Sequence, residues 1–333
     1  MSSRAFLLIA VLLVLAFSAV AQQAACTTDV AVSVIKANGE PVEGLAAADF
    51  IAQLKKQRLS IQSATYDAGP RRILLVIDEA RELSAEARKV EVEFATSIIS
   101  SAQPEDALAL VSARGAGPAI KFGTDRNAVL QALNKNHDEQ GRGKQPGVLD
   151  AVAEGITWFG QPQLGDSIVV IAMDLEGNHN TNYKSVARLL EEHGIRAFGV
   201  ALGHLQLINQ TTGALGMGRE GLGYVDPGMP LRNQTGDANF LPLTVNSGGY
   251  VVPEDTMTEK QEFKLTDVKK LELQKTAANI SRLIDRFYAL HLPNTPSAHS
   301  ESWTVSLSPS KLQALPGTHV LYPHELGLCP SAR

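Results

Sequence analysis

Two continuous apolar runs, each ending in an aspartate, are the strongest pattern along the chain. They are residues 72–78 (RILLVID) and 167–174 (SIVVIAMD). A run without polar alternation is typical of a strand buried on both faces, as in the centre of a parallel α/β sheet. In open sheets of that kind, ligands bind outside the carboxyl ends of the strands. We therefore predict that Asp78 and Asp174 lie at one edge of a shared sheet and mark the functional site.

Between and beyond these runs, apolar strand patterns alternate with helical periodicity. Further buried strands are predicted at 107–113 and 195–202, and a final edge strand follows the turn at 247–249. Alternating strands and helices predict an α/β fold with a doubly wound, mostly parallel sheet. Residues 203–239 are rich in Gly and Asn and have no clear periodicity, which predicts a long loop.

Both ends of the chain have strand patterns of a different kind. Alternation at 30–35 predicts a strand, and a hairpin is predicted with arms at 51–54 and 59–66. After a helix at 271–287, two more strands are predicted, which would complete a small β-rich accessory part begun at the N-terminus. The predicted organisation is a signal peptide at 1–21, an N-terminal β-rich segment at 22–68, an α/β domain at 69–252, and C-terminal elements at 253–333, where the two late strands are 288–292 and 303–307.

The first residues predict export. Arg4 is followed by an apolar core at 6–17 and by small residues at 19–21, which is the pattern of a cleaved signal peptide. The apolar run is shorter than the roughly 20 residues that span a bilayer, so an uncleaved anchor is the alternative. A lipoprotein signal would need an apolar residue where Gln23 stands. No later segment is long and apolar enough to span a membrane, and we expect a periplasmic or extracellular protein.

The two cysteines, Cys26 and Cys329, lie near opposite ends of the chain. Because an exported chain meets an oxidising compartment, a disulfide that joins the termini is one interpretation. Two unrelated thiols are the other. The formal net charge of -5 argues against nucleic acid as a partner, since phosphate binding needs a basic face.

Four short motifs, in order, resemble the von Willebrand factor A-like domains, and more closely the bacterial exported "VWFA-related" proteins. Residues 38–50 look like that family's opening hairpin, and Phe122-Gly123-Thr124-Asp125 looks like a strand-to-helix junction of the domain. Residues 149–152 look like the helix after its second metal loop, and Asn246-Ser247-Gly248-Gly249 looks like its Thr-Gly-Gly turn. The resemblance covers most of the mature chain.

The resemblance implies a binding or adhesion module without catalysis, in which a divalent cation such as Mg²⁺ or Mn²⁺ lies at the strand edge. The family's ligands would fall on Asp78, on the two positions occupied by Ala80 and Glu82, near Pro146 and on Asp174. The hydroxyl ligands of the family are missing from this sequence. The candidate metal ligands are therefore Asp78, Glu82 and Asp174 in a degenerate site, and any cation is expected to bind weakly, since such ions prefer about six oxygen ligands.

Three functions remain open at this stage. The first is a module that recognises a protein or surface ligand at the edge that carries Asp78 and Asp174. The second is a structural or assembly protein of the cell envelope that uses its β-rich part for strand pairing. The third is a hydrolase in which Asp78 and Asp174 act as an acid and a base. In a further interpretation, Asp78 and Asp174 have none of these roles. They are then remnants of a site and only cap backbone amides or bind water.

Overall fold

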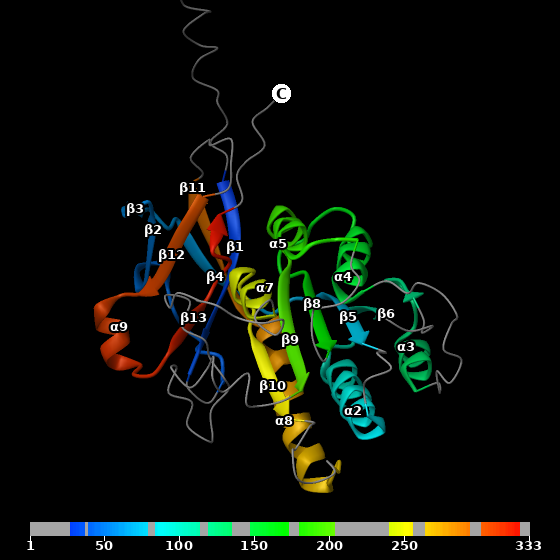
Figure 1. Cartoon of the computed structure of the whole chain (residues 1–333). Helices are drawn as coiled ribbons and strands as arrows, with labels where there is room; N and C mark the ends of the chain where they lie inside the picture. The colour runs from blue at the N-terminus through cyan, green and yellow to red at the C-terminus, as the bar shows by residue number, and fades with distance from the viewer. Residues whose placement is uncertain are drawn as a thin grey trace, which may run out of the picture.

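The computed structural model describes residues 27–36, 39–78, 84–113, 119–134, 147–172, 180–203, 240–255, 264–293 and 301–326. The described strands form one six-stranded sheet and two four-stranded sheets. In Figure 1 the six-stranded sheet and its helices lie on the right, and the two smaller sheets lie on the left. The predicted signal peptide, both cysteines and residues 204–239 of the predicted loop lie outside the described residues.

The six-stranded sheet has the strand order β10-β9-β8-β5-β6-β7. Its strands are β5 (Arg72–Asp78), β6 (Ala107–Ala113), β7 (Ala119–Ile120), β8 (Ser167–Ala172), β9 (Arg196–Gly203) and β10 (Val251–Asp255). Only the short edge strand β7 runs antiparallel to its neighbour among these six. When these six strands are numbered by their order in the chain and read across the sheet from β7 to β10, the order is 3-2-1-4-5-6, which is common in doubly wound sheets. The predicted fold class is confirmed, and so is the prediction that β5 and β8 share one sheet, in which they are direct neighbours.

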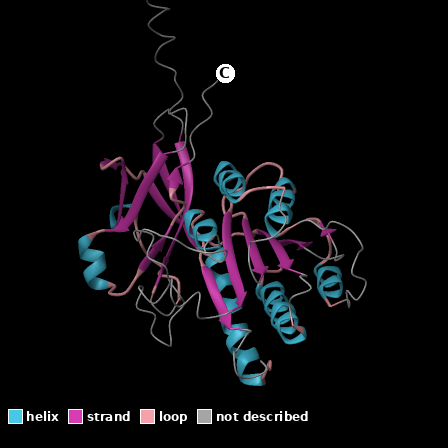
Figure 2. Ribbon diagram, in the orientation of Figure 1, coloured by secondary structure: helices cyan, strands magenta, loops and turns pink. Residues whose placement is uncertain are grey.

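Helices cover both faces of this sheet, as Figure 2 shows. On one face lie α2 (Ala85–Ser101), α3 (Arg126–Leu133) and α8 (Asp267–Asp285). On the other lie α4 (Val148–Thr157), α5 (Tyr183–Glu192) and α7 (Phe240–Asn246). Alternate residues of β5 enter the two cores: Ile73 and Leu75 pack with the first set of helices, whereas Leu74 and Val76 pack with the second. This explains why the sequence of β5 has no polar alternation.

The two four-stranded sheets pack face to face as a β-sandwich around one apolar core. One sheet has the order β13-β1-β11-β4 and the other β14-β12-β2-β3. Their strands are β1 (Thr27–Ile35), β2 (Phe50–Leu54), β3 (Gln57–Leu59), β4 (Ser63–Asp67), β11 (Phe287–Pro293), β12 (Glu301–Leu307), β13 (His319–Leu321) and β14 (Glu325–Leu326). Two short helices, η1 (Ala47–Asp49) and α9 (Pro309–Ala314), complete the described elements of this part.

Strands from both ends of the chain pair in the sandwich. β1 pairs with β11, and β2 pairs with β12, in both cases antiparallel. The core side chains alternate along these strands, as the sequence patterns predicted, for example Val30, Val32 and Val34 of β1. The prediction that N- and C-terminal strands form one β-rich part is confirmed by this pairing.

The predicted hairpin with a second arm at 59–66 is wrong. β3 pairs with β2 as expected but ends at Leu59. β4 begins at Ser63 and pairs with β11, in the opposite sheet of the sandwich. Period-2 alternation identifies the buried face of a strand, but it carries no information about which strand is its neighbour.

The predicted helix at 271–287 differs from α8 at both ends. Thr266 caps α8 by accepting a hydrogen bond from Lys269 N, so the helix begins at Asp267. It ends at Asp285, because Phe287 and Tyr288 already belong to β11. A single residue, Arg286, thus connects the last helix of the α/β domain to the sandwich.

None of the helices among the described residues combines the length and the apolar character needed to cross a bilayer.

Candidate functional site

Asp78 is the last residue of β5, at the carboxyl edge of the six-stranded sheet, and its side chain is fully buried. The neighbouring parallel strand β8 ends at Ala172, so the chain that follows it leaves from the same edge. Asp174 follows two positions later and lies outside the described residues. Ala80, Glu82 and Pro146 also lie outside them, as do Cys26 and Cys329 with their predicted disulfide. Their positions stay predictions.

A second buried acid lies beside Asp78. The carboxylate of Glu91, on α2, accepts a hydrogen bond from the backbone N–H of Asp78 at 2.5 Å. Glu91 is 1% exposed, although it carries a carboxyl group. Its position in the sequence is four residues after Ala87 and three before Phe94, on the buried face of α2. The sequence analysis did not identify Glu91 as a site residue. The signal that could have identified it is a carboxylate within the apolar stripe of a helix.

The described residues do not by themselves form a metal site. A group of three or more His, Cys, Asp or Glu side chains placed to hold an ion does not occur among them. Of the candidate ligands, only Asp78 can be placed, and Glu91 already accepts a backbone hydrogen bond. A hard divalent cation prefers about six oxygen ligands, so we derive no chemistry through such an ion.

Another acid at this edge fixes the chain that enters α5. Asp150, in the first turn of α4, accepts hydrogen bonds from the backbone N–H groups of Asn180 at 3.0 Å and Thr181 at 2.7 Å. Burial raises the pKa of Asp150, but these hydrogen bonds outweigh it and hold the pKa below its usual range. The α4–α5 side of the edge is therefore held in place by an ionised carboxylate.

The N-terminus of α8 lies at the same edge, beside the N-terminus of α2. Glu86, in the first turn of α2, accepts a hydrogen bond from the backbone N–H of Leu265, just before α8, at 2.9 Å. From there the first turns of α8 present Val268 and Leu271, which are 70% and 52% exposed. Residues three apart on a helix lie on one face, so these two side chains form a single apolar patch. In the described part of the chain, the only other large exposed hydrophobic residue is Leu312, on α9.

The opposite, amino edge of the sheet joins the α/β domain to the sandwich through buried charges. Arg196, the first residue of β9, is 1% exposed. Its guanidinium donates to Ser33 Oγ of β1 at 3.1 Å and to the backbone carbonyl of Leu283 at 3.0 Å. A third hydrogen bond reaches the carbonyl of Ile284 at 2.9 Å. Burial, together with the nearby positive charge of Arg71, lowers the pKa of Arg196 to about 9.

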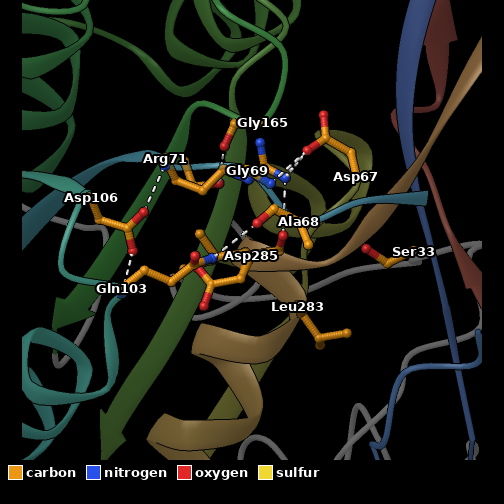
Figure 3. Close-up of polar contacts among 12 residues, drawn as sticks. Ser33, Asp67, Ala68, Gly69, Arg71, Gln103, Asp106, Gly165, Leu283 and Asp285 are labelled. Carbon is orange, nitrogen blue, oxygen red and sulfur yellow. Dashed lines mark hydrogen bonds and ion pairs between the residues drawn. The ribbon is translucent and has the colours of Figure 1, made fainter. Parts of the chain in front are cut away.

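Arg71 makes the second connection at this edge, shown in Figure 3. Its guanidinium donates to Asp67 Oδ1 at 2.7 Å and to the backbone carbonyl of Asp285 at 3.0 Å, while its backbone N–H donates to Asp106 Oδ1 at 2.7 Å. The guanidinium carbons of Arg71 and Arg196 lie 4.3 and 4.6 Å from the ring centroid of Phe287. Two arginines thus cap the last carbonyls of α8, where the helix dipole is negative.

Asp285 is a buried acid of this joint with one unsatisfied carboxylate oxygen. It is 7% exposed, and its Oδ1 has no hydrogen-bond partner among the described residues. Burial, reinforced by the carboxylate of Asp106, raises the pKa of Asp285 from 3.8 to about 6, against the opposing effect of Arg71. Asp67 behaves in the opposite way: burial raises its pKa, but hydrogen bonds from Gly69 and Arg71 outweigh it and lower the pKa below the usual range.

A tight turn closes the joint from the side of the α/β domain. Ser247 Oγ accepts a hydrogen bond from the backbone N–H of Ala197 at 2.8 Å and donates to the carbonyl of Thr244 at 2.8 Å. A Cβ on Gly249 would lie 1.9 Å from the carbonyl oxygen of Ala197, and a Cβ on Gly248 would lie 2.7 Å from the nitrogen of Pro323. The Ser-Gly-Gly turn that supported the sequence resemblance therefore places β10 against β9, and the turn itself packs against the C-terminal segment at Pro323.

Comparison with known proteins gives only a general picture. No protein-family model and no curated protein matches the sequence. Among solved structures, the conserved hypothetical protein BatB from Bacteroides thetaiotaomicron is similar with a TM-score of 0.40 and 13% identity, covering 63% of this chain and 98% of that one. An aerotolerance-related membrane protein from Bacteroides fragilis has a TM-score of 0.41 and 12% identity, covering 64% of this chain and 99% of that one.

A von Willebrand factor type A structure from Catenulispora acidiphila has a TM-score of 0.40 and 9% identity, covering 92% of this chain and 64% of that one. TM-scores of this size carry no weight for function. The fold is established by the strand order and strand directions of this chain itself. That topology is the doubly wound α/β fold that the sequence patterns and the sequence resemblance predicted.

Proposed function

We propose that this chain is an exported, non-catalytic binding module that recognises a protein or surface ligand at the carboxyl edge of its six-stranded sheet. The observation that carries this proposal is the apolar patch of Val268 and Leu271 on the first turns of α8. Single exposed hydrophobic residues are ordinary, but adjacent ones on one helix face favour an interaction surface. Open α/β sheets bind their ligands at this same edge.

The surroundings of the patch support the proposal. Glu86 fixes the chain that enters α8, so the patch is presented from an ordered position and not from a free end. Asp78 and Glu91 lie at the same edge of the sheet, at the end of β5 and on α2. A ligand with an apolar anchor therefore meets a preformed surface, which lowers the entropy that binding costs.

A pair of charge substitutions tests the patch. Val268→Asp together with Leu271→Asp places acids near the start of α8, where the helix dipole favours them, so the fold should be kept. Leu312→Asp, on α9 of the sandwich, is the matched control, because Leu312 is also exposed, at 45%. The three chains are immobilised and exposed to the exported protein fraction of the source cells, and captured proteins are quantified by mass spectrometry.

We expect partners whose capture falls at least about tenfold with the α8 double variant, equivalent to about 1.4 kcal/mol, and is unchanged by Leu312→Asp. The strongest such partner is then purified and its affinity for each chain is measured by calorimetry. Identical capture by the wild type and the α8 double variant would place the binding surface elsewhere and contradict the proposal.

The second candidate is a structural or assembly role of the β-rich part. The observation in its favour is the exposed edge strand β4, which pairs on one side only among the described residues. A hydrolase, the third candidate, needs both Asp78 and Asp174, and only Asp78 can be placed. Turnover of any substrate that Asp78→Asn abolishes would favour the hydrolase over the binding module.

A further inference from the structure

The edges of the three sheets differ in how far they are protected. An unpaired edge strand is a template for another chain, and proteins usually shorten such strands or place proline or lysine in them. Among the described residues, β7 and β14 have two residues, and β3 and β13 have three. β3 also follows Lys55 and Lys56, both with positive φ. The edge strand β10 is longer but contains Pro253, which has no N–H to donate.

β4 is the exception among these edges. It has five residues, with the sequence SATYD, and contains neither proline nor lysine nor glycine. One side pairs with β11 over its full length, from Ser63 opposite His291 to Asp67 opposite Phe287. On the other side no described strand is paired with it. Ser63 and Thr65 are exposed, so the outer face of this strand is open to solvent.

We propose that the β4 edge binds a second copy of this chain, antiparallel and centred on Thr65, to form a two-fold symmetric dimer. The sequence of β4 fits itself in this register: Thr65 lies opposite Thr65, Ser63 opposite Asp67, and Ala64 opposite Tyr66. No like charges meet, and facing threonines form favourable cross-strand pairs. A self-complementary patch of this kind is what a two-fold interface requires.

The faces of the strand fit as well. Ala64 and Tyr66 pack against the sandwich core, so pairing of two copies would place a small side chain opposite a large one on the inner face. The tyrosine ring is already held, 5.1 Å from the ring of Tyr288 and with its hydroxyl donating to Glu43 at 3.0 Å. The dimer would join two four-stranded sheets into one continuous sheet through β4.

The test uses the full chain and its mass in solution, measured by light scattering and sedimentation. We expect a dimer at about 10–100 μM chain, a range of affinity ordinary for a small interface. Thr65→Lys places two like charges opposite each other and should raise the dimer dissociation constant at least about fivefold. Thr65→Glu should do the same, and an equimolar mixture of the two variants should restore the dimer, because Lys then faces Glu.

Thr304→Lys is the matched control, since Thr304 is an exposed strand threonine on β12 of the other sheet. It should leave the dimer unchanged, and thermal melting should show that every variant is folded. Thr65→Cys adds a direct readout, because facing Cα atoms of antiparallel strands lie about 4.5–5.5 Å apart, within disulfide reach. We expect a covalent dimer on oxidation with Thr65→Cys and none beyond the wild-type level with Thr304→Cys.

Three results would overturn the proposal. The first is a wild-type chain that stays monomeric at about 100 μM. The second is a dimer that persists unchanged in Thr65→Lys, which would place the interface elsewhere. The third is a monomeric chain that binds a different protein and loses this binding in Thr65→Lys. In that case β4 would be a docking edge for that protein and not for a second copy. The α8 double variant should still dimerise, so failure here is distinguishable from failure of the proposed binding surface.

Discussion

The two edges of the six-stranded sheet are built from charged groups in opposite ways. At the amino edge, Arg71 and Arg196 are buried, and each donates to the carbonyls at the end of α8. Their charges are balanced by nearby acids, and the result joins two parts of the molecule. At the carboxyl edge, Asp78 and Glu91 are buried beside one another, and the first turns of α8 expose two apolar side chains. The first arrangement holds the fold together, and the second presents a surface.

The largest expected effect comes from removing Arg196. Arg196→Met keeps the apolar part of the side chain but leaves Ser33 Oγ and the carbonyls of Leu283 and Ile284 without their donor. We expect a loss of about 3–5 kcal/mol in the free energy of unfolding, measured by urea denaturation, because buried polar groups would be left unsatisfied. Arg188→Met, which removes an exposed pair with Glu192, is the control and should change stability by less than about 0.5 kcal/mol.

The turn at the joint should give the next largest effect. Gly249→Ala places a methyl group 1.9 Å from the carbonyl oxygen of Ala197, so the backbone must move. We expect a loss of about 2–3 kcal/mol in urea denaturation, typical of overpacking. Gly160→Ala is informative for comparison, since its Cβ would meet nothing within 4 Å and only its positive φ opposes the change. Equal losses for the two variants would mean that close packing at Gly249 is not what matters.

A smaller, pH-dependent effect is expected at Asp285. A carboxyl whose pKa rises from 3.8 to about 6 on folding opposes folding once it ionises. The chain is therefore most stable, as far as Asp285 is concerned, below pH 3.8, where the carboxyl is protonated in both states. This stability is lost as the pH rises through about 6. Asp285→Asn should stabilise the chain by about 1–2 kcal/mol at pH 8 and by little at pH 4.

Asp67→Asn provides the opposite sign for that experiment. The pKa of Asp67 is lowered in the fold, so its contribution is present at neutral pH and is lost as the pH falls through the folded value. Asp67→Asn should destabilise the chain at pH 8, and the difference should shrink toward low pH. Thermal unfolding of both variants from pH 4 to pH 8 measures the two curves. Parallel curves would show that Asp285 and Asp67 do not differ in the way proposed.

The smallest effect is expected from divalent cations at the carboxyl edge. A degenerate site around Asp78, Glu82 and Asp174 should bind Mg²⁺ or Mn²⁺ with a dissociation constant no tighter than about 1 mM in a calorimetric titration. Asp78→Asn should weaken that binding further. A dissociation constant unaffected by Asp78→Asn would end the metal hypothesis and leave Asp78 with a structural role.

The sequence was sufficient for the central sheet. For the sandwich it indicated that strands from both ends of the chain combine, but not how all of them pair. β5 and β8 were identified because a strand buried on both faces leaves an uninterrupted apolar run. β4 was assigned to the wrong neighbour, because Ala64 and Tyr66 alternate as they would in a hairpin, and the partner strand β11 lies far away in the sequence. Strand partners across such distances depend on the packing of the whole chain, which no local pattern records.

The candidate site was predicted in part for a similar reason. Asp78 ends an apolar run and was found, whereas Glu91 is embedded in the buried stripe of α2 and was not. The buried charges of the amino edge could also have been identified from the sequence. Arg71, Asp106 and Arg196 each lie at or just before the first residue of a buried strand. A charge in that position must find a partner at the strand end, but the sequence does not say which one.

The pairing of β1 with β11 has a consequence for how the protein is made. Asp29 and His291, which are in contact in the sandwich, are separated by 262 residues. At a synthesis rate of about 5–20 residues per second, the first strand waits about 13–50 s before its partner is available. During that interval β1 lacks both of its partner strands, β11 and β13, and its apolar residues are exposed to aggregation.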